Sequence, residues 1–227
     1  MRIGILLPAY NEEKNIGIVV KQAKKYFPDS EIIVVDDGSE DKTKEIALKN
    51  GVRVLRHKKN KGKGVALKTG FNYFLNKNNV DTILVADSDR QYSIKDAPNL
   101  LEPLKKGKAD YVVGCRDWSV VPFRHRMGNF VWRNIFNILF RTRLKDTNCG
   151  FIAMRSDVAE KMNIGKGGYI IDNYMLMQAM KNKFKIINAP VSIDYNHIRE
   201  IPVGIKMVAG VAFFILKEGI KYNLNKL

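Results

Sequence analysis

Two aspartates in the segment Asp87-Ser88-Asp89 carry the strongest chemical signal, because they directly follow the apolar run Thr82–Ala86. Side chains two positions apart on an extended segment point the same way. Carboxylates held side by side repel each other unless a cation joins them, and hard divalent ions prefer oxygen ligands. An acidic turn that caps the next helix is the alternative. With Gln91 nearby, the pair favours a Mg²⁺ or Mn²⁺ site that holds a diphosphate.

A second acidic cluster, residues 36–39 with the sequence DDGS, follows the apolar run Glu31–Val35. Carboxylates at the end of a strand can accept hydrogen bonds from the ribose or base of a nucleotide, and Gly38 permits a tight turn. A turn that caps the following helix is the alternative. No GxGxxG follows the first apolar run and no GxxxxGK[ST] occurs, which argues against a dinucleotide fold and a P-loop.

Basic residues form the third signal. Residues 61–64, with the sequence KGKG, open a helical pattern, and lysines at a helix N-terminus favour phosphate. A solvated loop is the alternative interpretation. Further along the chain, Arg116, Arg124 and Arg126 are candidates to brace a diphosphate.

Short apolar runs alternate with helical patterns through the first half of the chain, which predicts a parallel, doubly wound α/β sheet. In such sheets ligands bind beyond the carboxyl ends of the strands, where the polar clusters fall. The runs of strand length are Ile3–Leu7, Glu31–Val35, Arg53–Arg56, Thr82–Ala86 and Tyr111–Gly114. The second half predicts a helix over 124–144, a strand over 150–154, a helix over 172–183, an edge hairpin around Pro190 and a final helix over about 203–224.

Composition sets the class of protein. The 227 residues include 39 Lys and Arg against 23 Asp and Glu, a net charge of +16, and 45% are hydrophobic. Two cysteines and three scattered histidines exclude a disulfide framework and a zinc site with ordinary spacing. No apolar run reaches the length of a membrane span and no cleavable signal is recognisable, so we expect a cytoplasmic protein. The charge requires an anionic partner, but no nucleic-acid motif appears and the basic residues are spread along the chain.

Five motifs in this order resemble family 2 glycosyltransferases, in the branch of the dolichyl-phosphate mannose and glucose synthases: PAYNE (8–12), DDGS (36–39), GKG (62–64), DSDRQ (87–91) and DTNCGF (146–151). The resemblance implies a GT-A fold, a Rossmann-like, mostly parallel central sheet with helices on both faces. It also implies a catalytic domain over 1–200, with a nucleotide-sugar half (1–115) and an acceptor half (116–200) that contains an interfacial helix over 124–144. A C-terminal amphipathic helix would occupy 201–227.

The resemblance further implies a UDP- or GDP-sugar donor, Mg²⁺ or Mn²⁺, and inversion at the anomeric carbon. It assigns the nucleotide to Pro8, Ala9, Tyr10, Glu12, Val35, Asp37, Ser39, Lys63, Asp87 and Ser88, and the metal to Asp87, Asp89 and Gln91. It assigns catalysis to Asp89, Arg116, Arg126 and Asp146, and phosphate binding on the acceptor side to Arg124, Arg126 and Lys206. Cys115 departs from the family's Gly-Ser-Arg, and residues 197–206 follow the family only loosely.

The acceptor decides whether a base is needed. A phosphate monoester, with a second pKa near about 6, is already a nucleophilic dianion at neutral pH. A sugar hydroxyl needs a carboxylate such as Asp146 or Asp172. The arginines of residues 124–143 favour dolichyl or polyprenyl phosphate as the acceptor, in glycan assembly. A saccharide hydroxyl in polysaccharide or glycolipid synthesis is the first alternative, and a non-enzymatic basic module that binds a membrane or nucleic acid is the second.

The helix predicted over 124–144 also bears on where the protein acts. Its apolar residues, bounded by arginines, favour a helix lying in a membrane interface, whereas a buried amphipathic helix is the alternative. We therefore expect a peripheral protein on the cytoplasmic face of an anionic membrane, with a membrane protein as a further candidate partner. The apolar residues are Phe130, Val131, Trp132, Ile135, Phe136, Ile138, Leu139 and Phe140.

Overall fold

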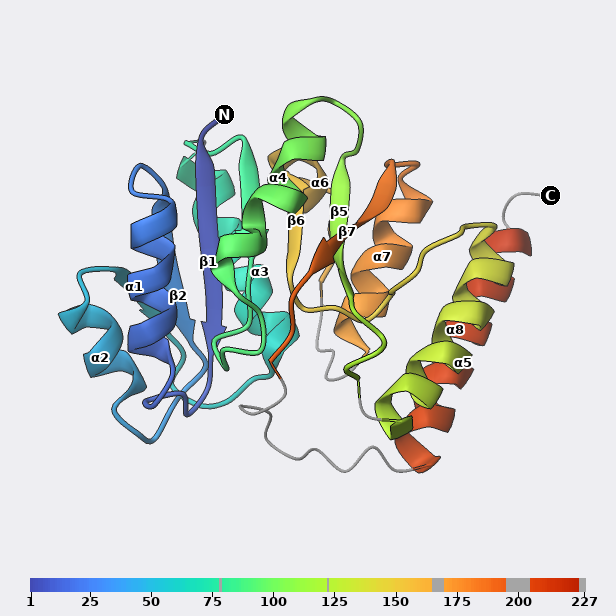
Figure 1. Ribbon diagram of the computed structural model, residues 1–227, viewed down its shortest axis with the longest axis horizontal. Coiled ribbons are helices and arrows are strands. Elements are labelled where there is room, and N and C mark those ends of the chain that lie inside the picture. The colour runs from blue at the N-terminus through green and yellow to red at the C-terminus, as the bar shows by residue number, and fades with distance from the viewer. Residues whose placement is uncertain (78, 122, 165–169, 195–204, 225–227) are drawn as a thin grey trace.

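One seven-stranded sheet organises the chain, in the order β3-β2-β1-β4-β6-β5-β7 (Figure 1). The computed structural model describes residues 1–77, 79–121, 123–164, 170–194 and 205–224. All neighbouring strands pair in parallel except β6, which is antiparallel to both β4 and β5. The strands are β1 Ile3–Ala9, β2 Glu31–Asp36, β3 Arg53–Arg56, β4 Thr82–Val85, β5 Tyr111–Arg116, β6 Ile152–Arg155 and β7 Ile186–Val191. The mostly parallel α/β sheet predicted from the sequence is confirmed.

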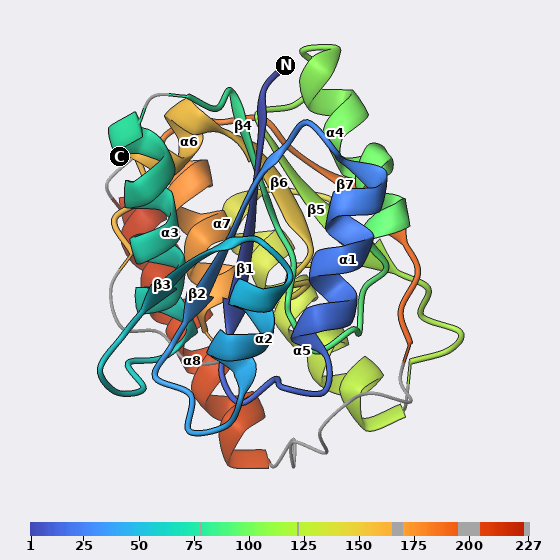
Figure 2. The ribbon, with the colours of Figure 1, turned by 90° about the vertical axis from the view of Figure 1, so that its left-hand side faces the viewer.

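Helices cover both faces of this sheet: α1 and α4 lie on one side, and α3, α6 and α7 on the other (Figure 2). Apolar residues of β1, β2 and β4 are buried between the two helical layers, as parallel strands require. The helices are α1 Ile16–Tyr26, α2 Thr43–Lys49, α3 Lys63–Lys77, α4 Ala97–Lys105, α5 Phe123–Phe140, α6 Ser156–Glu160, α7 Ile171–Lys181 and α8 Ile205–Leu224, with a short 3₁₀ turn at Ile94–Asp96.

The strand register brings distant motifs together. Ala9 at the end of β1 pairs with Asp36 at the end of β2, so the PAYNE and DDGS segments leave the sheet side by side. The sheet also continues through β6 and β7, which lie beyond residue 116. The two halves predicted over 1–115 and 116–200 therefore share one sheet.

The predicted edge hairpin around Pro190 is wrong. Residues 186–191 form one continuous strand, β7, in which Pro190 is paired in register with Cys115 of β5. Because β7 is the outermost strand, a proline is tolerated where its missing N–H would face away from the neighbouring strand.

The core covers most of the apolar residues of α5 that were cited for an interfacial helix. Trp132, Phe136 and Phe140 are buried, and Val131, Ile135 and Leu139 pack against the core. Of the apolar residues cited for an interfacial helix, Phe130 and Ile138 are the exposed ones. Within the described ranges, no helix is both long and apolar enough to cross a membrane.

Candidate active site

The site is built at the carboxyl ends of β1, β2 and β4, where three motifs are tied together by hydrogen bonds. Ser88 Oγ, just beyond β4, donates to the carbonyl oxygen of Pro8 in β1 at 2.8 Å. The backbone N–H of Asp37 donates to the carbonyl oxygen of Ala9, also at 2.8 Å. Because Ser88 is buried and held in this way, it fixes the turn that carries Asp87 and Asp89.

Lys63 joins the two halves of the chain. Its Nζ lies 2.7 Å from Asp87 Oδ1 and 3.6 Å from Asp172 Oδ1. Lys63 begins α3, whereas Asp172 lies in the first turn of α7. Burial lowers the pKa of Lys63, but the carboxylates of Asp172 and Asp87 outweigh it and the pKa is raised overall, so the ammonium keeps its charge. The sequence ranked Asp172 only as one possible base; its place beside Lys63 and Asp87 is a result of the fold.

Gly150 makes this cluster possible. A Cβ at residue 150 would lie 2.0 Å from Asp87 Oδ2 and 2.8 Å from Lys63 Nζ. The DTNCG segment (residues 146–150) therefore packs directly on the Asp87 carboxylate and the Lys63 ammonium. Asn173 Nδ2 donates to Asn148 Oδ1 at 3.0 Å, which ties the same segment to α7.

Asp89 has the electrostatics expected of a carboxylate that needs a cation. Burial, together with the charge of Asp87, raises the pKa of Asp89 to about 7. The backbone N–H of Gln91 donates to Asp89 Oδ1 at 3.0 Å, so Gln91 orients this carboxylate through its main chain. Burial also raises the pKa of Asp172.

The donor set of Asp87 and Asp89 fits a hard divalent cation, since both offer carboxylate oxygens and one is destabilised without a counter-charge. Among the residues that the structure describes, no three His, Cys, Asp or Glu side chains converge to hold a metal. The protein would therefore supply part of the coordination, and a diphosphate and water the rest.

Asp37 organises the basic loop before α3. Its carboxylate accepts hydrogen bonds from the backbone N–H groups of Lys61 and Gly62, at 3.0 and 2.7 Å to the nearer oxygens. His57 Nδ1 lies 2.6 Å from Asp37 Oδ1, and His57 Nε2 lies 2.9 Å from Thr69 Oγ1. His57 could not be identified from the sequence, because a lone histidine at the end of a short strand has no distinctive spacing. Asp37 thus holds the loop that leads to Lys63.

The remaining nucleotide candidates differ in what they can offer a ligand. Tyr10 is 37% exposed and can stack on a base. Ser39 is buried and accepts a hydrogen bond from the N–H of Asn11, while Glu12 accepts one from Asn15. The side chain of Val35 is completely buried, so Val35 could contact a nucleoside only through its main chain.

Arg116 and Asp146 require a correction. Arg116 Nε lies 2.7 Å from Asp146 Oδ2 and Nη2 lies 2.9 Å from Asp146 Oδ1, and Asp146 is fully buried. The guanidinium also donates to Asn129 Oδ1 and the carbonyl oxygen of Asn148. Both Asp146 oxygens are therefore engaged, and the residue is not placed to act as a base. Arg116 anchors the DTNCG segment through its bonds to Asp146 and to the carbonyl oxygen of Asn148.

Of the other predicted phosphate-binding residues, Arg126 is the one whose side chain the structure describes. Arg126 is exposed, its guanidinium lies 6.0 Å from the Phe123 ring centre, and no described contact joins it to Asp87 or Asp89. The side chains of Arg124 and Lys206 lie outside the part of the chain that the structure describes.

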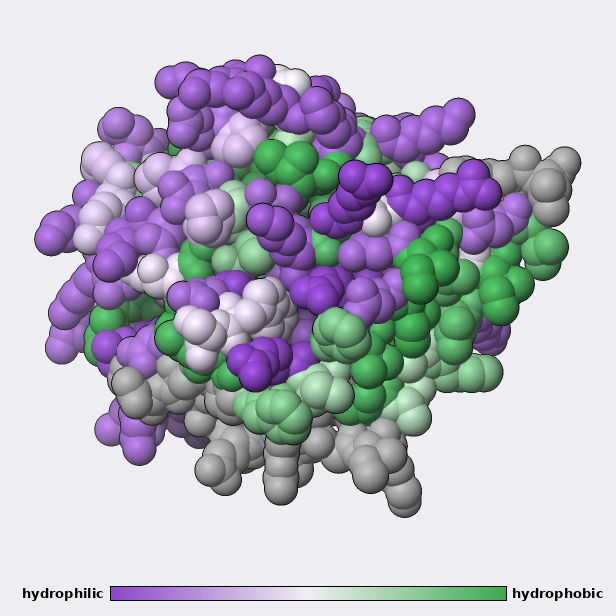
Figure 3. Space-filling model, turned by 45° about the vertical axis from the view of Figure 1, so that its right-hand side comes forward, coloured by the Kyte–Doolittle hydropathy of each residue, from purple (hydrophilic) through white to green (hydrophobic). Residues whose placement is uncertain are grey.

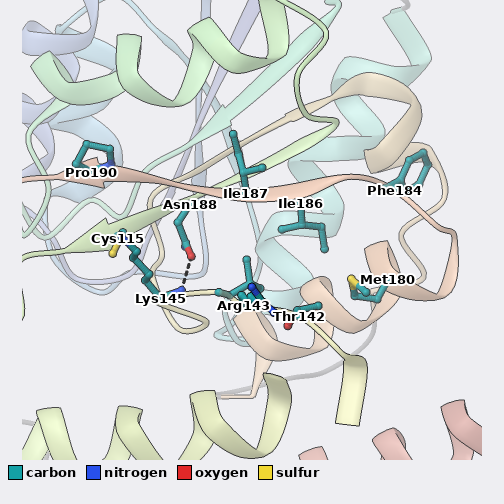
Figure 4. Close-up of a pocket in the computed structure, with 11 residues that line it drawn as sticks. Cys115, Thr142, Arg143, Lys145, Met180, Phe184, Ile186, Ile187, Asn188 and Pro190 are labelled. Carbon is teal, nitrogen blue, oxygen red and sulfur yellow. Dashed lines mark hydrogen bonds between the residues drawn. The ribbon is translucent and has the colours of Figure 1, made fainter. Parts of the chain in front are cut away.

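A separate pocket of about 640 Å³ opens between β7 and the segment that follows α5 (Figure 4). Its lining includes Arg143, Lys145 and Phe184, and the backbone N–H of Lys145 donates to Asn188 Oδ1 at 2.7 Å. It contains none of the predicted site residues and no carboxylate, so it is not the candidate active site.

Comparisons with known proteins identify relatives of this chain and structures of similar fold. The chain is 25% identical over 98% of its length to the polyprenol monophosphomannose synthase of Mycolicibacterium smegmatis, covering 88% of that protein. It is 28% identical over 85% of its length to the UDP-N-acetylglucosamine–dolichyl-phosphate N-acetylglucosaminyltransferase of Methanococcus voltae, covering 86% of it. Its fold is similar to that of glucosyl-3-phosphoglycerate synthase from Mycobacterium tuberculosis, which was solved with Mn²⁺, UDP and phosphoglyceric acid. The TM-score is 0.78 at 20% sequence identity, and the match covers 97% of this chain and 78% of that one.

The likeness to that synthase establishes the GT-A fold. The family model for glycosyl transferase family 2 matches residues 4–162, which include the acidic segment at Asp87, the loop at Lys63 and the DTNCG segment. The chain therefore belongs to glycosyl transferase family 2 and is a glycosyltransferase.

Proposed function

We propose that this enzyme transfers a sugar from a UDP- or GDP-sugar to dolichyl or polyprenyl phosphate, with inversion and with Mg²⁺ or Mn²⁺. The relatives named for polyprenol and dolichyl phosphate support this acceptor class. The reaction would serve glycan assembly at the cytoplasmic face of an anionic membrane, where a membrane protein is a further candidate partner.

The acidic cluster supports the donor side of the proposal. Asp87 and Asp89 would hold the metal, and Gln91 orients Asp89 through its main chain. A bound divalent ion supplies positive charge that stabilises a departing nucleoside diphosphate. Lys63, fixed between Asp87 and Asp172, adds a second positive charge at the same place. Tyr10 would stack on the base, at the end of β1.

The buried ion pair between Asp146 and Arg116 is the observation that carries the acceptor proposal. Both of its oxygens are bonded to Arg116 and the residue is fully buried, so it is not positioned to reach a sugar hydroxyl. A phosphate acceptor needs no such base, because it is mostly a dianion above its second pKa of about 6. The ion pair leaves Asp146 a structural role, which suits a nucleophile that is already ionised.

A saccharide hydroxyl remains the second candidate acceptor because of Asp172. Burial raises the pKa of this carboxylate toward the range in which a general base works best, and it lies next to Lys63. The same carboxylate would serve a phosphate acceptor only by positioning Lys63.

The test is a screen of labelled UDP- and GDP-sugars against polyprenyl phosphate, with and without Mn²⁺ or Mg²⁺. Asp89→Asn should lower transfer by at least about 100-fold, because it removes charge that the metal requires. Asp157→Asn, a change of an exposed aspartate on α6, is the matched control and should retain full activity. A screen without product on any lipid phosphate would refute the acceptor.

Asp172→Asn separates the two acceptors. With a phosphate acceptor we expect a moderate loss and an unchanged pH profile of kcat, since no proton is taken from the acceptor. With a hydroxyl acceptor the loss should reach about 10²–10⁴-fold, the contribution of a general base, and the acidic limb of the profile should disappear.

A further inference from the structure

Helices α5 and α8 form a two-helix layer at the β7 side of the sheet (Figure 1). They run in the same direction: a Cβ on Gly128 would lie 3.6 Å from Val208 Cγ2 near their beginnings, and one on Gly219 would lie 2.6 Å from Leu139 Cδ1 near their ends. Trp132 Nε1 of α5 donates to the carbonyl oxygen of Val208 at 3.0 Å. The relative rotation of the two helices is therefore fixed.

Helix α8 is apolar on two opposite sides. Val211 and Ile215 are buried on its inner side, which faces α5 and the core. On its outer side a second stripe is 40–68% exposed, and none of the residues that the structure describes covers it. The four residues are spaced by three or four positions, so they share one helix face. They are Phe213, Leu216, Ile220 and Leu224.

Helix α5 carries a matching outer stripe, 48–76% exposed, on the side opposite its buried Trp132, Phe136 and Phe140. Both helices turn their inner residues toward the same core, so the two outer stripes share one face of the layer. Figure 3 shows apolar side chains gathered on this side of the molecule. The residues of the α5 stripe are Phe123, Met127, Phe130 and Ile138.

Positive charge borders this face on both sides. At 100° per residue, Arg126 and Arg133 fall on the side of α5 that is turned away from α8, and Lys217 and Lys221 on the side of α8 that is turned away from α5. Residues 118–145 contain six Lys and Arg and no Asp or Glu. The one acid of α8, Glu218, is paired with Lys181 at 3.1 Å.

This charge pattern favours an anionic bilayer over a second copy of the chain as the partner of this face. A second copy of the chain would bring two basic faces together, whereas an anionic bilayer offers apolar chains for the stripes and negative head groups for their borders. Helix α5 also begins seven residues after Arg116, which ends β5 at the carboxyl edge of the sheet, the edge that carries the candidate active site.

We propose that the outer face of α5 and α8 docks in the interface of an anionic lipid bilayer, with both apolar stripes among the acyl chains and the flanking arginines and lysines at the head groups. The inference rests on the proposed function, since it names the surface through which an enzyme without a described membrane span reaches a lipid acceptor.

The test is co-sedimentation of the full chain with vesicles of phosphatidylcholine, alone or mixed with phosphatidylglycerol. The double variant Phe213→Ser/Ile220→Ser should bind mixed vesicles roughly 30-fold more weakly, because two large apolar side chains lose their burial. Leu48→Ser is the matched control: Leu48 is 49% exposed but lies on α2, and its loss should leave binding unchanged. Thermal melting in solution should be the same for all three proteins, because these side chains are exposed in the folded chain.

The charges are tested separately. Lys217→Gln/Lys221→Gln should lose binding to mixed vesicles by about fivefold per lysine and leave binding to phosphatidylcholine unchanged. Wild-type binding by the serine variant would overturn the proposal. So would a dimer in solution that the serine variant dissociates, since the face would then belong to a second copy.

Two further results separate this inference from the proposed function. Asp89→Asn should bind vesicles like the wild type, since it lies outside the docking face. The serine variant should retain transfer to polyprenyl phosphate dispersed in detergent and lose transfer to the same acceptor in vesicles. Vesicle binding as predicted, without sugar transfer to any lipid phosphate, would refute the function and leave the docking surface in place.

Discussion

Replacing Gly150 with alanine gives a direct test of the site geometry. The new Cβ would lie 2.0 Å from Asp87 Oδ2, 2.8 Å from Asp87 Cγ and 2.8 Å from Lys63 Nζ. An ordinary carbon contact needs about 3.5 Å, so the Asp87 carboxylate or the DTNCG segment must move by more than about 1 Å. Such a movement breaks the 2.7 Å ion pair between Asp87 and Lys63.

A displacement of about 1 Å at reacting groups costs on the order of 100-fold in rate. We therefore expect Gly150→Ala to lower kcat/KM for sugar transfer by about 100-fold and to weaken binding of Mn²⁺ with UDP or GDP. The effect on stability should be smaller, about 1–3 kcal/mol, the usual cost of overpacking.

The matched control is Gly210→Ala. Among the residues that the structure describes, none lies within 4 Å of a Cβ at residue 210, so this variant should keep wild-type activity in detergent. Gly150→Ala with activity within threefold of the wild type and unchanged Mn²⁺ affinity would show that the packing of the DTNCG segment on Asp87 does not matter for catalysis.

Three other perturbations follow from the same contacts. The Lys63→Met variant should bind Mn²⁺ alone about tenfold more tightly, because it removes a cation that competes for Asp87, yet it should bind Mn²⁺ with UDP or GDP more weakly. Calorimetry measures both affinities. A parallel change in the two would contradict the role given to Lys63. Asp146→Asn should lower the free energy of unfolding, measured in urea, by about 3–5 kcal/mol, because it leaves the Arg116 charge buried without its partner. A loss below about 1 kcal/mol would argue against the ion pair. For Asp89, the folded pKa of about 7 exceeds the ordinary value of 3.8, so between these pH values the folded state keeps a proton that the unfolded state has lost. The metal-free chain should then lose stability relative to Asp89→Asn as pH rises through this window and show no further difference above it. A stability difference that does not vary with pH would show that Asp89 titrates normally.

The sequence by itself determined the class of fold and the residues of the donor side. The alternation of short apolar runs with helical patterns fixes a parallel sheet, and such a sheet must collect the residues that follow its strands at one edge. Asp37, Asp87 and Asp89 could be found in this way because strand ends are a local property. The aspartate pair also implies its own chemistry, since two neighbouring carboxylates require a cation.

Only the tertiary structure decided the partners of these residues. Asp146 and Asp172 look alike in the sequence, but Asp146 is locked by Arg116 from β5, whereas Asp172 meets Lys63 from α3. The same limit applies to α5: its periodicity shows an amphipathic helix but not which apolar residues α8 and the core cover. These partners lie 30 residues apart for Arg116 and Asp146 and 109 residues apart for Lys63 and Asp172. Their pairing depends on how the sheet and its helices pack together, which no local pattern encodes.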